Sequence, residues 1–142
     1  MATHTFEIDE TFDVPRGKVF ALFADHRRFG KILGAPVKRI KDSNQADPNG
    51  LGSVRWLGLG PIGLEETITV FEPDSLIEYT ITSFSPIRNH LGCIRFEETP
   101  EGHTRVRYRI AFDDIVPFTG KLVSSCLEWA IRRGVRQVPR LA

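Results

Sequence analysis

The sequence predicts an α+β fold in which a curved antiparallel sheet wraps around one long C-terminal helix. Across residues 118–138 the apolar side chains recur at three- and four-residue steps, the spacing of one apolar stripe on a helix. Nearly all other apolar residues alternate with polar ones, as in half-buried strands. A helix of roughly twenty residues is about 30 Å long, the width of a small domain. Its apolar stripe must be covered, and the strands that make up most of the remaining chain can cover it. The stripe consists of Leu122, Val123, Cys126, Leu127, Ala130, Ile131, Val135 and Val138.

The first quarter of the chain supplies one strand and two short helices. Phe6, Ile8 and Phe12 alternate with acidic residues, which predicts a strand over residues 3–13. Pro15 suits the first turn of a helix that continues to about residue 24. A second short helix is expected at residues 25–33, and the Gly-Ala-Pro segment at 34–36 ends it.

The middle of the chain has the pattern of strands joined by turns. The predicted strands cover residues 37–41, 53–59, 62–72, 75–84, 90–99 and 103–113, and a long exposed loop occupies residues 42–52. Turns are expected at residues 60–61, 73–74, 85–89 and 101–102. Arg105, Arg107 and Arg109 alternate with apolar residues, so we expect them on the solvated outer face of the sheet.

Length and composition narrow the class of protein. The 142 residues suit one domain over residues 1–142, with 41% hydrophobic and 26% charged residues. The net charge of +1 argues against nucleic acid or an anionic membrane as a partner. Cys93 and Cys126 form no CxxC motif, which favours a reduced, cytoplasmic protein, although they also allow one disulfide. We expect no signal peptide, no stable membrane insertion, no cofactor, and a monomer or homodimer.

Several segments are similar to one known family. They are FDVP at 12–15 with VFALFAD at 19–25, GLGSVRW at 50–56, FEP at 71–73 with LIEY at 76–79, and the terminal helix. The chain resembles the START-related and Bet v 1-like (SRPBCC) superfamily, within it the polyketide cyclase/dehydrase and lipid-transport group. The resemblance implies a helix-grip fold, a seven-stranded sheet gripping the C-terminal helix around an apolar cavity. Family members carry lipids, sterols, hormones or polyketides, and a minority are enzymes.

An NTF2-like cone is the competing fold, because it also houses small dehydratases and cyclases. It usually begins with helices and ends on strands. This chain begins with a strand and ends on its longest helix, which ranks the cone second.

Polar residues on otherwise apolar strand faces are the candidate site residues. Hairpin turns decide which residues share a face. The turns at 73–74 and 101–102 predict the inner-face pairs Val70–Ile77, Ile68–Tyr79, Glu66–Ile81, Phe96–Val106, Ile94–Tyr108 and Gly92–Ile110. The candidate ligand-binding residues are Glu10, Trp56, Ile68, Tyr79, Ile81, Gly92, Ile94, Tyr108, Leu127 and Ile131.

Glu66 and His90 are the candidate catalytic residues. They lie on strands separated by one other strand, so their Cα atoms are expected roughly 12 Å apart, with Gly92 leaving space between them. Such a pair could polarise a ligand carbonyl or move a proton. Two alternatives stay open: an ion pair of Glu66 with Arg55 across the 60–61 hairpin, or a β-bulge that turns Glu66 to water.

Other motifs have simpler interpretations. Residues 58–63 match GxGxxG, but a strand pattern follows, so a hairpin turn is favoured over a dinucleotide loop. The four histidines, His4, His26, His90 and His103, lack metal-ligand spacing, and no Ser-His-Asp pattern is present. Tyr79 and Tyr108 also suit core aromatics with satisfied hydroxyls.

Three functions follow from these observations. The first is binding or carrying a small hydrophobic ligand, such as a lipid, a polyketide or an aromatic metabolite. The second is a cyclase or dehydratase that uses Glu66 and His90. The third is a protein-partner module built on the basic segments 26–31 and 38–41, whose alternative is a solvated face.

Overall fold

The computed structural model describes residues 4–59, 61–116 and 118–142. Strand β1 (His4–Phe12) is followed by helices α1 (Arg16–Ala24) and α2 (His26–Leu33). The remaining strands are β2 (Val37–Lys41), β3 (Val54–Leu59), β4 (Ile62–Glu72), β5 (Leu76–Ile81), β6 (Ile87–Glu98) and β7 (Thr104–Asp114). The chain ends in α3 (Gly120–Val135) and a single-turn helix α4 (Val138–Leu141). Thr3 and Gly60, which the sequence assigned to the first strand and to a turn, lie outside the described residues.

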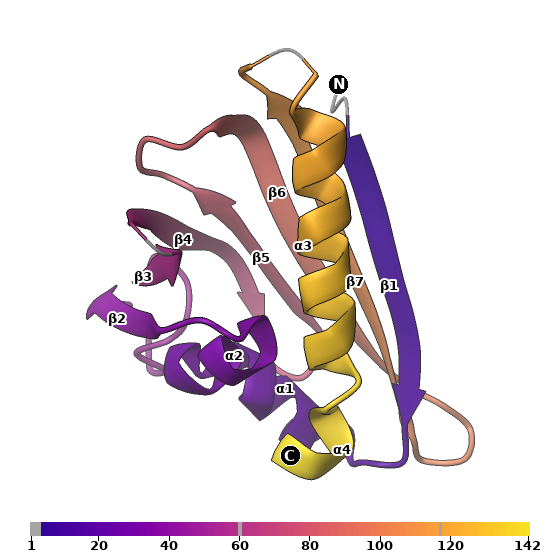
Figure 1. Ribbon diagram of the computed structural model, residues 1–142. Helices are drawn as coiled ribbons and strands as arrows, with labels where there is room; N and C mark the ends of the chain where they lie inside the picture. The colour runs from indigo at the N-terminus through magenta and orange to yellow at the C-terminus, as the bar shows by residue number, and fades with distance from the viewer. Residues whose placement is uncertain (1–3, 60, 117) are drawn as a thin grey trace.

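The strands form one seven-stranded antiparallel sheet in the order β1-β7-β6-β5-β4-β3-β2. Helix α3 runs along one face of this sheet beside β1, and α1 and α2 close the end of the fold near the C-terminus (Figure 1). The predicted fold class, a helix-grip with two short helices after the first strand, is confirmed.

The β4–β5 register shows how two deviations from the prediction cancel. The turn is one residue longer than predicted, because Glu72 pairs with Leu76, and this shift makes Val70 face Glu78 instead of Ile77. A bulge between Ile68 and Val70 then restores the phase. The predicted pairs of Ile68 and Glu66 are therefore confirmed, whereas the pairing of Val70 with Ile77 is wrong. All three pairs predicted between β6 and β7 are confirmed.

Helix α3 is shorter than the predicted range 118–138. Phe118 has a φ of 70°, which is outside the helical region, and its side chain is 98% exposed. The apolar stripe is best covered in its C-terminal half: Ile131, Val135 and Val138 are buried, Val123 and Leu127 are partly buried against the core, and Leu122 is 69% exposed. In the C-terminal half of α3, Gly134 lies against the backbone of Ile32 in α2. The contact is so close that a Cβ on Gly134 would collide with the carbonyl group of Ile32.

Aromatic side chains fill the core beside α1 and α2. Phe20 and Phe23 pack edge-on against Phe96, and Phe29 packs against both Tyr79 and Tyr108. Trp129 takes no part in this core, because it is 65% exposed on α3. The aromatic core occupies one end of the space between helix and sheet and leaves the rest for a cavity.

Three further expectations concern the cysteines, membrane-crossing helices and the arginines of β7. Cys93 and Cys126 are both free thiols, so the alternative of one disulfide is wrong. Across the described residues, none of the helices combines the length and the apolar character that crossing a membrane requires. The arginines of β7 lie on the sheet face opposite α3, as predicted, where Arg105 pairs with Asp9 and Arg107 with Glu97.

Candidate ligand cavity

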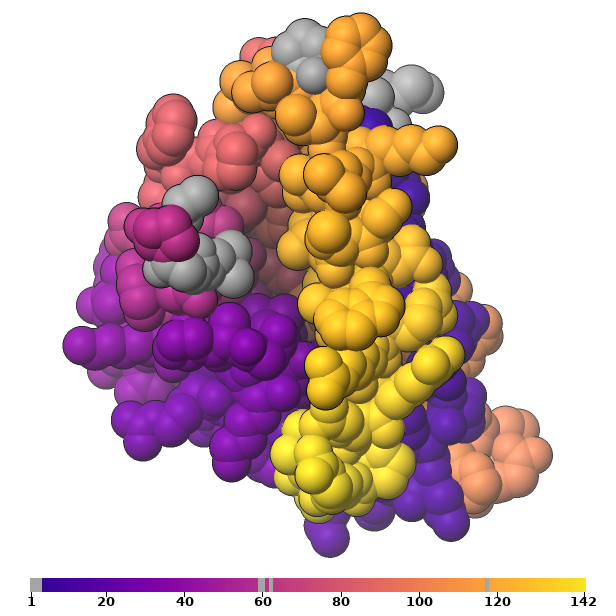
Figure 2. All heavy atoms as spheres, viewed as in Figure 1, coloured from indigo at the N-terminus to yellow at the C-terminus, as the bar shows by residue number. Residues whose placement is uncertain are grey.

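A cavity of about 130 Å³ lies between the sheet and α3. Its wall is mostly apolar, and Glu66, His90 and the Tyr79 ring supply its polar side. The space-filling view shows the molecule hollowed beside α3, between the helix and the strands (Figure 2). The lining residues are Leu33, Leu57, Leu64, Glu66, Tyr79, Ile81, Ile87, His90, Ile110, Leu127, Ala130 and Ile131.

Half of the residues proposed from the sequence line this cavity. These are Glu66, Tyr79, Ile81, His90, Leu127 and Ile131. The others lie elsewhere: Glu10, Trp56, Ile68, Gly92, Ile94 and Tyr108 are not part of its wall. Ile68 and Ile94 are 2% and 1% exposed within the hydrophobic core.

Trp56 and Glu10 lie away from the cavity for different reasons. Trp56 lies over Gly58 and Gly63, on the sheet face opposite its buried neighbours Arg55 and Leu57. Glu10 lies on the inner-face side of β1, as predicted, because it pairs with Val106. Its carboxylate, however, lies 3.7 Å from Arg136 at the end of α3. The structure therefore gives Glu10 a strand-to-helix ion pair.

Gly92 has a different role from the predicted one. A Cβ on Gly92 would collide with the ring of Tyr79, which lies directly over this residue. The space above Gly92 is therefore filled by an aromatic side chain, and it does not separate Glu66 from His90. Glycine is required here because two neighbouring strands place a ring and a backbone in close contact.

Arg55 and Glu66 form a buried ion pair at one side of the cavity. They face each other across β3 and β4, and Nε and Nη2 of Arg55 lie 2.9 and 2.8 Å from the same oxygen, Oε1 of Glu66. The guanidinium lies between two aromatic rings, 4.1 Å from the centroid of Phe29 and 4.4 Å from that of Tyr79. Burial raises the pKa of the Glu66 carboxyl, and the charge of Arg55 opposes this shift.

The predicted alternative, an ion pair of Glu66 with Arg55, is confirmed. The carboxyl of Glu66 nevertheless lines the cavity. Arg55 holds one carboxyl oxygen, Oε1, and within the described residues the second oxygen accepts no hydrogen bond. A buried carboxylate with one committed oxygen can accept a hydrogen bond from a bound hydroxyl.

His90 is fixed by a bulge in β6. The register shifts between Arg88 and Leu91, and Asn89 has a φ of 53°, which turns the His90 side chain inward beside Ile87. Nδ1 of His90 accepts a hydrogen bond of 3.2 Å from the backbone N–H of Ile81. Burial lowers the pKa of His90 to about 4, with a further contribution from the charge of Arg55. The neutral ring therefore carries its proton on Nε2 and can donate it to a ligand oxygen.

Tyr79 and Tyr108 are the buried tyrosines near Arg55, Glu66 and His90. Their hydroxyls are hydrogen-bonded to each other, and both rings are buried. Burial is the main reason why the pKa of each hydroxyl is raised above its ordinary value. Both phenols therefore stay protonated at neutral pH, which matches the alternative of core aromatics with satisfied hydroxyls.

Several lining residues were missed from the sequence. Leu33 and Ala130 come from α2 and α3, and their apolar positions on predicted helices gave a partial signal. Ile87 was assigned to a turn, because the bulge that starts β6 early has no clear sequence signature. Leu57 and Leu64 face each other across β3 and β4, next to the Gly-rich hairpin.

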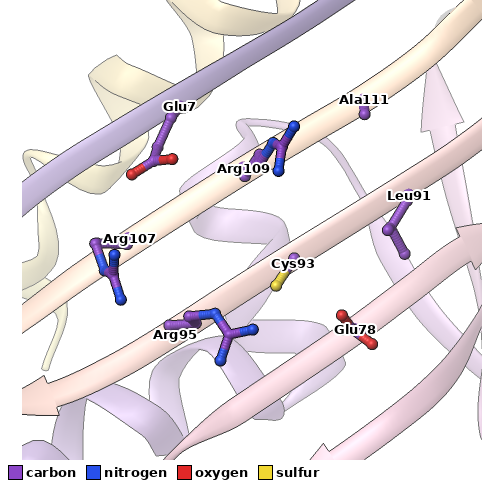
Figure 3. A pocket seen from close by; sticks show the side chains of 8 residues that line it. All are labelled: Glu7, Glu78, Leu91, Cys93, Arg95, Arg107, Arg109 and Ala111. Atoms are coloured by element: carbon purple, nitrogen blue, oxygen red, sulfur yellow. The ribbon is translucent and has the colours of Figure 1, made fainter. Parts of the chain in front are cut away.

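A second hollow lies on the opposite face of the sheet (Figure 3). It measures about 370 Å³, and charged side chains line most of it. Three arginines are balanced there by Glu7 and Glu78, and Arg107 is also paired with Glu97. This charge balance is that of a solvated sheet face, so the hollow does not compete with the apolar cavity as the ligand site.

Comparisons with known proteins agree with this geometry. The family model described as polyketide cyclase / dehydrase and lipid transport matches residues 3–142. A START superfamily protein from Mycobacterium smegmatis superposes with a TM-score of 0.75 at 8% identity, covering 95% of this chain and 93% of that one. A Mesorhizobium loti protein gives 0.74 at 12%, with 97% and 96% covered.

The structure of Ara h 8.0201 gives a TM-score of 0.62 at 18% identity, covering 94% of this chain and 98% of that chain. No curated protein matches the sequence. At these identities the structural matches show the fold, and the family model spans nearly the whole chain. The chain therefore belongs to the polyketide cyclase/dehydrase and lipid transport family.

Proposed function

We propose that the protein binds a compact hydrophobic molecule with one polar oxygen in the cavity between the sheet and α3. The observation that carries the proposal is the combination of an apolar wall with Glu66 and His90 on one side. A few fixed polar groups in an apolar concave site orient a ligand without supplying most of its affinity. Family membership supports a hydrophobic ligand of this kind.

The size of the cavity favours a small ligand. Its volume of about 130 Å³ is close to that of a roughly 150 Å³ dry cavity known to hold benzene. A single aromatic ring with a carbonyl substituent suits this volume better than a sterol or an acyl chain. The Nε2–H of His90 would donate to the carbonyl oxygen.

The first test is a pair of matched ligands measured by isothermal titration calorimetry. Acetophenone has a ring and a carbonyl oxygen, and ethylbenzene has a similar shape without the oxygen. We expect acetophenone to bind more tightly by about two- to tenfold, the effect of one hydrogen bond. His90→Gln should keep most of this difference, and His90→Leu should abolish it.

Native mass spectrometry of freshly purified protein, with denaturing extraction, provides an independent check. A retained apolar molecule whose retention falls in Glu66→Gln or His90→Leu supports the proposal. Protein that is empty and binds neither acetophenone, ethylbenzene nor oleic acid contradicts it.

Acid–base catalysis is the second candidate, because Glu66 and His90 border one cavity. Exchange of the acetophenone methyl protons in D₂O, followed by NMR, reports proton removal next to a carbonyl. Exchange above the buffer rate that disappears in Glu66→Gln would favour the enzyme. Exchange at the buffer rate favours the binding protein, since Arg55 holds Glu66 and a pKa of about 4 makes His90 a weak base.

A further inference from the structure

The structure brings the two basic segments of the sequence together on one surface. Strand β2 lies beside α2 (Figure 1), and the two elements line a hollow of about 610 Å³, here named the α2–β2 hollow. Four cations line it, Arg27 and Arg28 from α2 and Lys38 and Arg39 from β2, with one carboxylate, Asp25. The positive excess of this single surface is larger than the net charge of +1 of the whole chain.

Most of these cations lack a compensating carboxylate. Among the described residues, no carboxylate lies within ion-pair distance of Arg27, Arg28 or Lys38. Nη2 of Arg28 donates to the carbonyl oxygen of Leu141, a neutral acceptor that does not cancel the positive charge of Arg28. Arg39 is the exception, since its Nε donates to Asp42 at 2.7 Å.

His26 adds a buried polar group to the α2–β2 hollow. Its side chain is 1% exposed, and its Nε2 lies 2.9 Å from Oγ of Ser53. Nδ1 has no hydrogen-bond partner within the described part of the chain. Burial lowers the pKa of His26 to about 3, and the charges of Arg55 and Arg39 lower it further, which reports a positive field at this ring.

The hollow on the outer sheet face is the natural comparison. It also contains three arginines, but two glutamates lie among them (Figure 3). A further glutamate, Glu97, pairs with Arg107. Charge is nearly balanced there, whereas it is not balanced in the α2–β2 hollow. Among the described residues β2 is the last strand of the sheet, so no other strand pairs with its outer edge.

We propose that the α2–β2 hollow binds an anion that carries several phosphate groups. Guanidinium groups match the geometry of phosphate oxygens, and lysine adds a point charge. Cations spread over a helix and a strand suit a polyvalent anion better than a single carboxylate. The phosphates could belong to a free polyphosphate or to a lipid headgroup, and the experiment distinguishes these two sources.

The test titrates tripolyphosphate into the full-length protein by calorimetry at low and at physiological ionic strength. We expect saturable binding that weakens as salt rises, and loss of about tenfold or more in affinity for Arg27→Ser/Lys38→Ser. The matched control is Arg95→Ser/Arg109→Ser, which removes the same charge from the outer face and should change the affinity by less than about twofold. Equal losses in both variants, or no binding by the wild type, overturn the proposal.

NMR locates the site without any substitution. Tripolyphosphate should shift the backbone amide signals of residues 25–28 and 37–39, and shifts confined to other regions overturn the proposal. A parallel sedimentation assay compares vesicles of phosphatidylcholine with vesicles that also contain phosphatidic acid. Vesicle binding that depends on Arg27 and Lys38 assigns the phosphate to a headgroup, and tripolyphosphate binding without it assigns a free polyphosphate. The cavity variants Glu66→Gln and His90→Leu should bind tripolyphosphate normally, which separates this site from the proposed ligand cavity.

Discussion

Arg55 organises the polar side of the cavity. The side chain is 1% exposed, and its guanidinium lies between two aromatic rings. Two of the three guanidinium nitrogens contact the same oxygen of Glu66. The aromatic faces attract the cation, and the carboxylate neutralises it. The cavity-facing position of Glu66 is therefore set by a residue that does not itself line the cavity.

Arg55→Met should destabilise the protein by about 3–5 kcal/mol, because it leaves the buried carboxyl of Glu66 without its partner. The double variant Arg55→Met/Glu66→Leu should recover most of this loss, since a well-packed apolar pair can replace a buried ion pair. Urea unfolding followed by circular dichroism measures both values. A double variant as unstable as the single one would show that packing of the arginine between the rings, rather than charge, is decisive.

At the scale of elements, the placement of α3 decides whether a cavity exists. The helix is fixed at its C-terminal half, where Ile131, Gly134 and Val135 are buried, and its first turns stay largely exposed. Contact with α2 at Gly134 and Ile32 sets the distance between these two helices. The uncovered apolar residues at the start of α3 lie on the same helix as the cavity residue Leu127.

Gly134→Ala should destabilise the fold by about 1–3 kcal/mol, because its Cβ would overlap the backbone of Ile32 and force α2 and α3 apart. Thermal and urea unfolding measure the loss, and acetophenone binding reports whether the cavity changes with it. Gly17→Ala on α1 is the control, since its Cβ would meet Oδ1 of Asp74 at an ordinary 3.8 Å. The control should be neutral or slightly stabilising, and a larger loss there than at Gly134 would contradict this account.

For the whole molecule, two buried histidines make stability depend on pH. The pKa of His26 is lowered to about 3 and that of His90 to about 4, mainly by burial. Between pH 6.5 and these values, the unfolded chain binds protons that the folded chain does not. Stability is therefore complete above about pH 6.5 and falls as the pH falls.

Each histidine should remove up to about 1.4 kcal/mol per pH unit below 6.5. Glu66, whose pKa burial raises, acts in the opposite direction between its unfolded and folded values. Urea unfolding at pH 7.5, 6.5, 5.5 and 4.5, values chosen to bracket the ordinary histidine pKa of about 6.5, measures the slope. The variant His26→Asn/His90→Gln should show a flatter slope than the wild type whatever its absolute stability. An unchanged slope would exclude these histidines as its cause.

The alternation of the strands and the spacing of the last helix determined the fold class from the sequence. Antiparallel strands joined by short turns pair with the next strand along the chain, so the β6–β7 register followed from local pattern. The inward position of Glu66 also followed, although through a longer turn and a bulge that compensate each other. These features depend on contacts between residues close in sequence, which is why a pattern can predict them.

The tertiary structure alone decided which side chains fill the inner face and which contacts they make. It placed the Tyr79 ring over Gly92, paired Glu10 with Arg136, and left Trp129 exposed. It also joined the basic segments of α2 and β2 into one surface. Each of these outcomes depends on the curvature of the sheet and the position at which helices cross it. Such geometry arises from packing between distant residues, and neither periodicity nor composition records it.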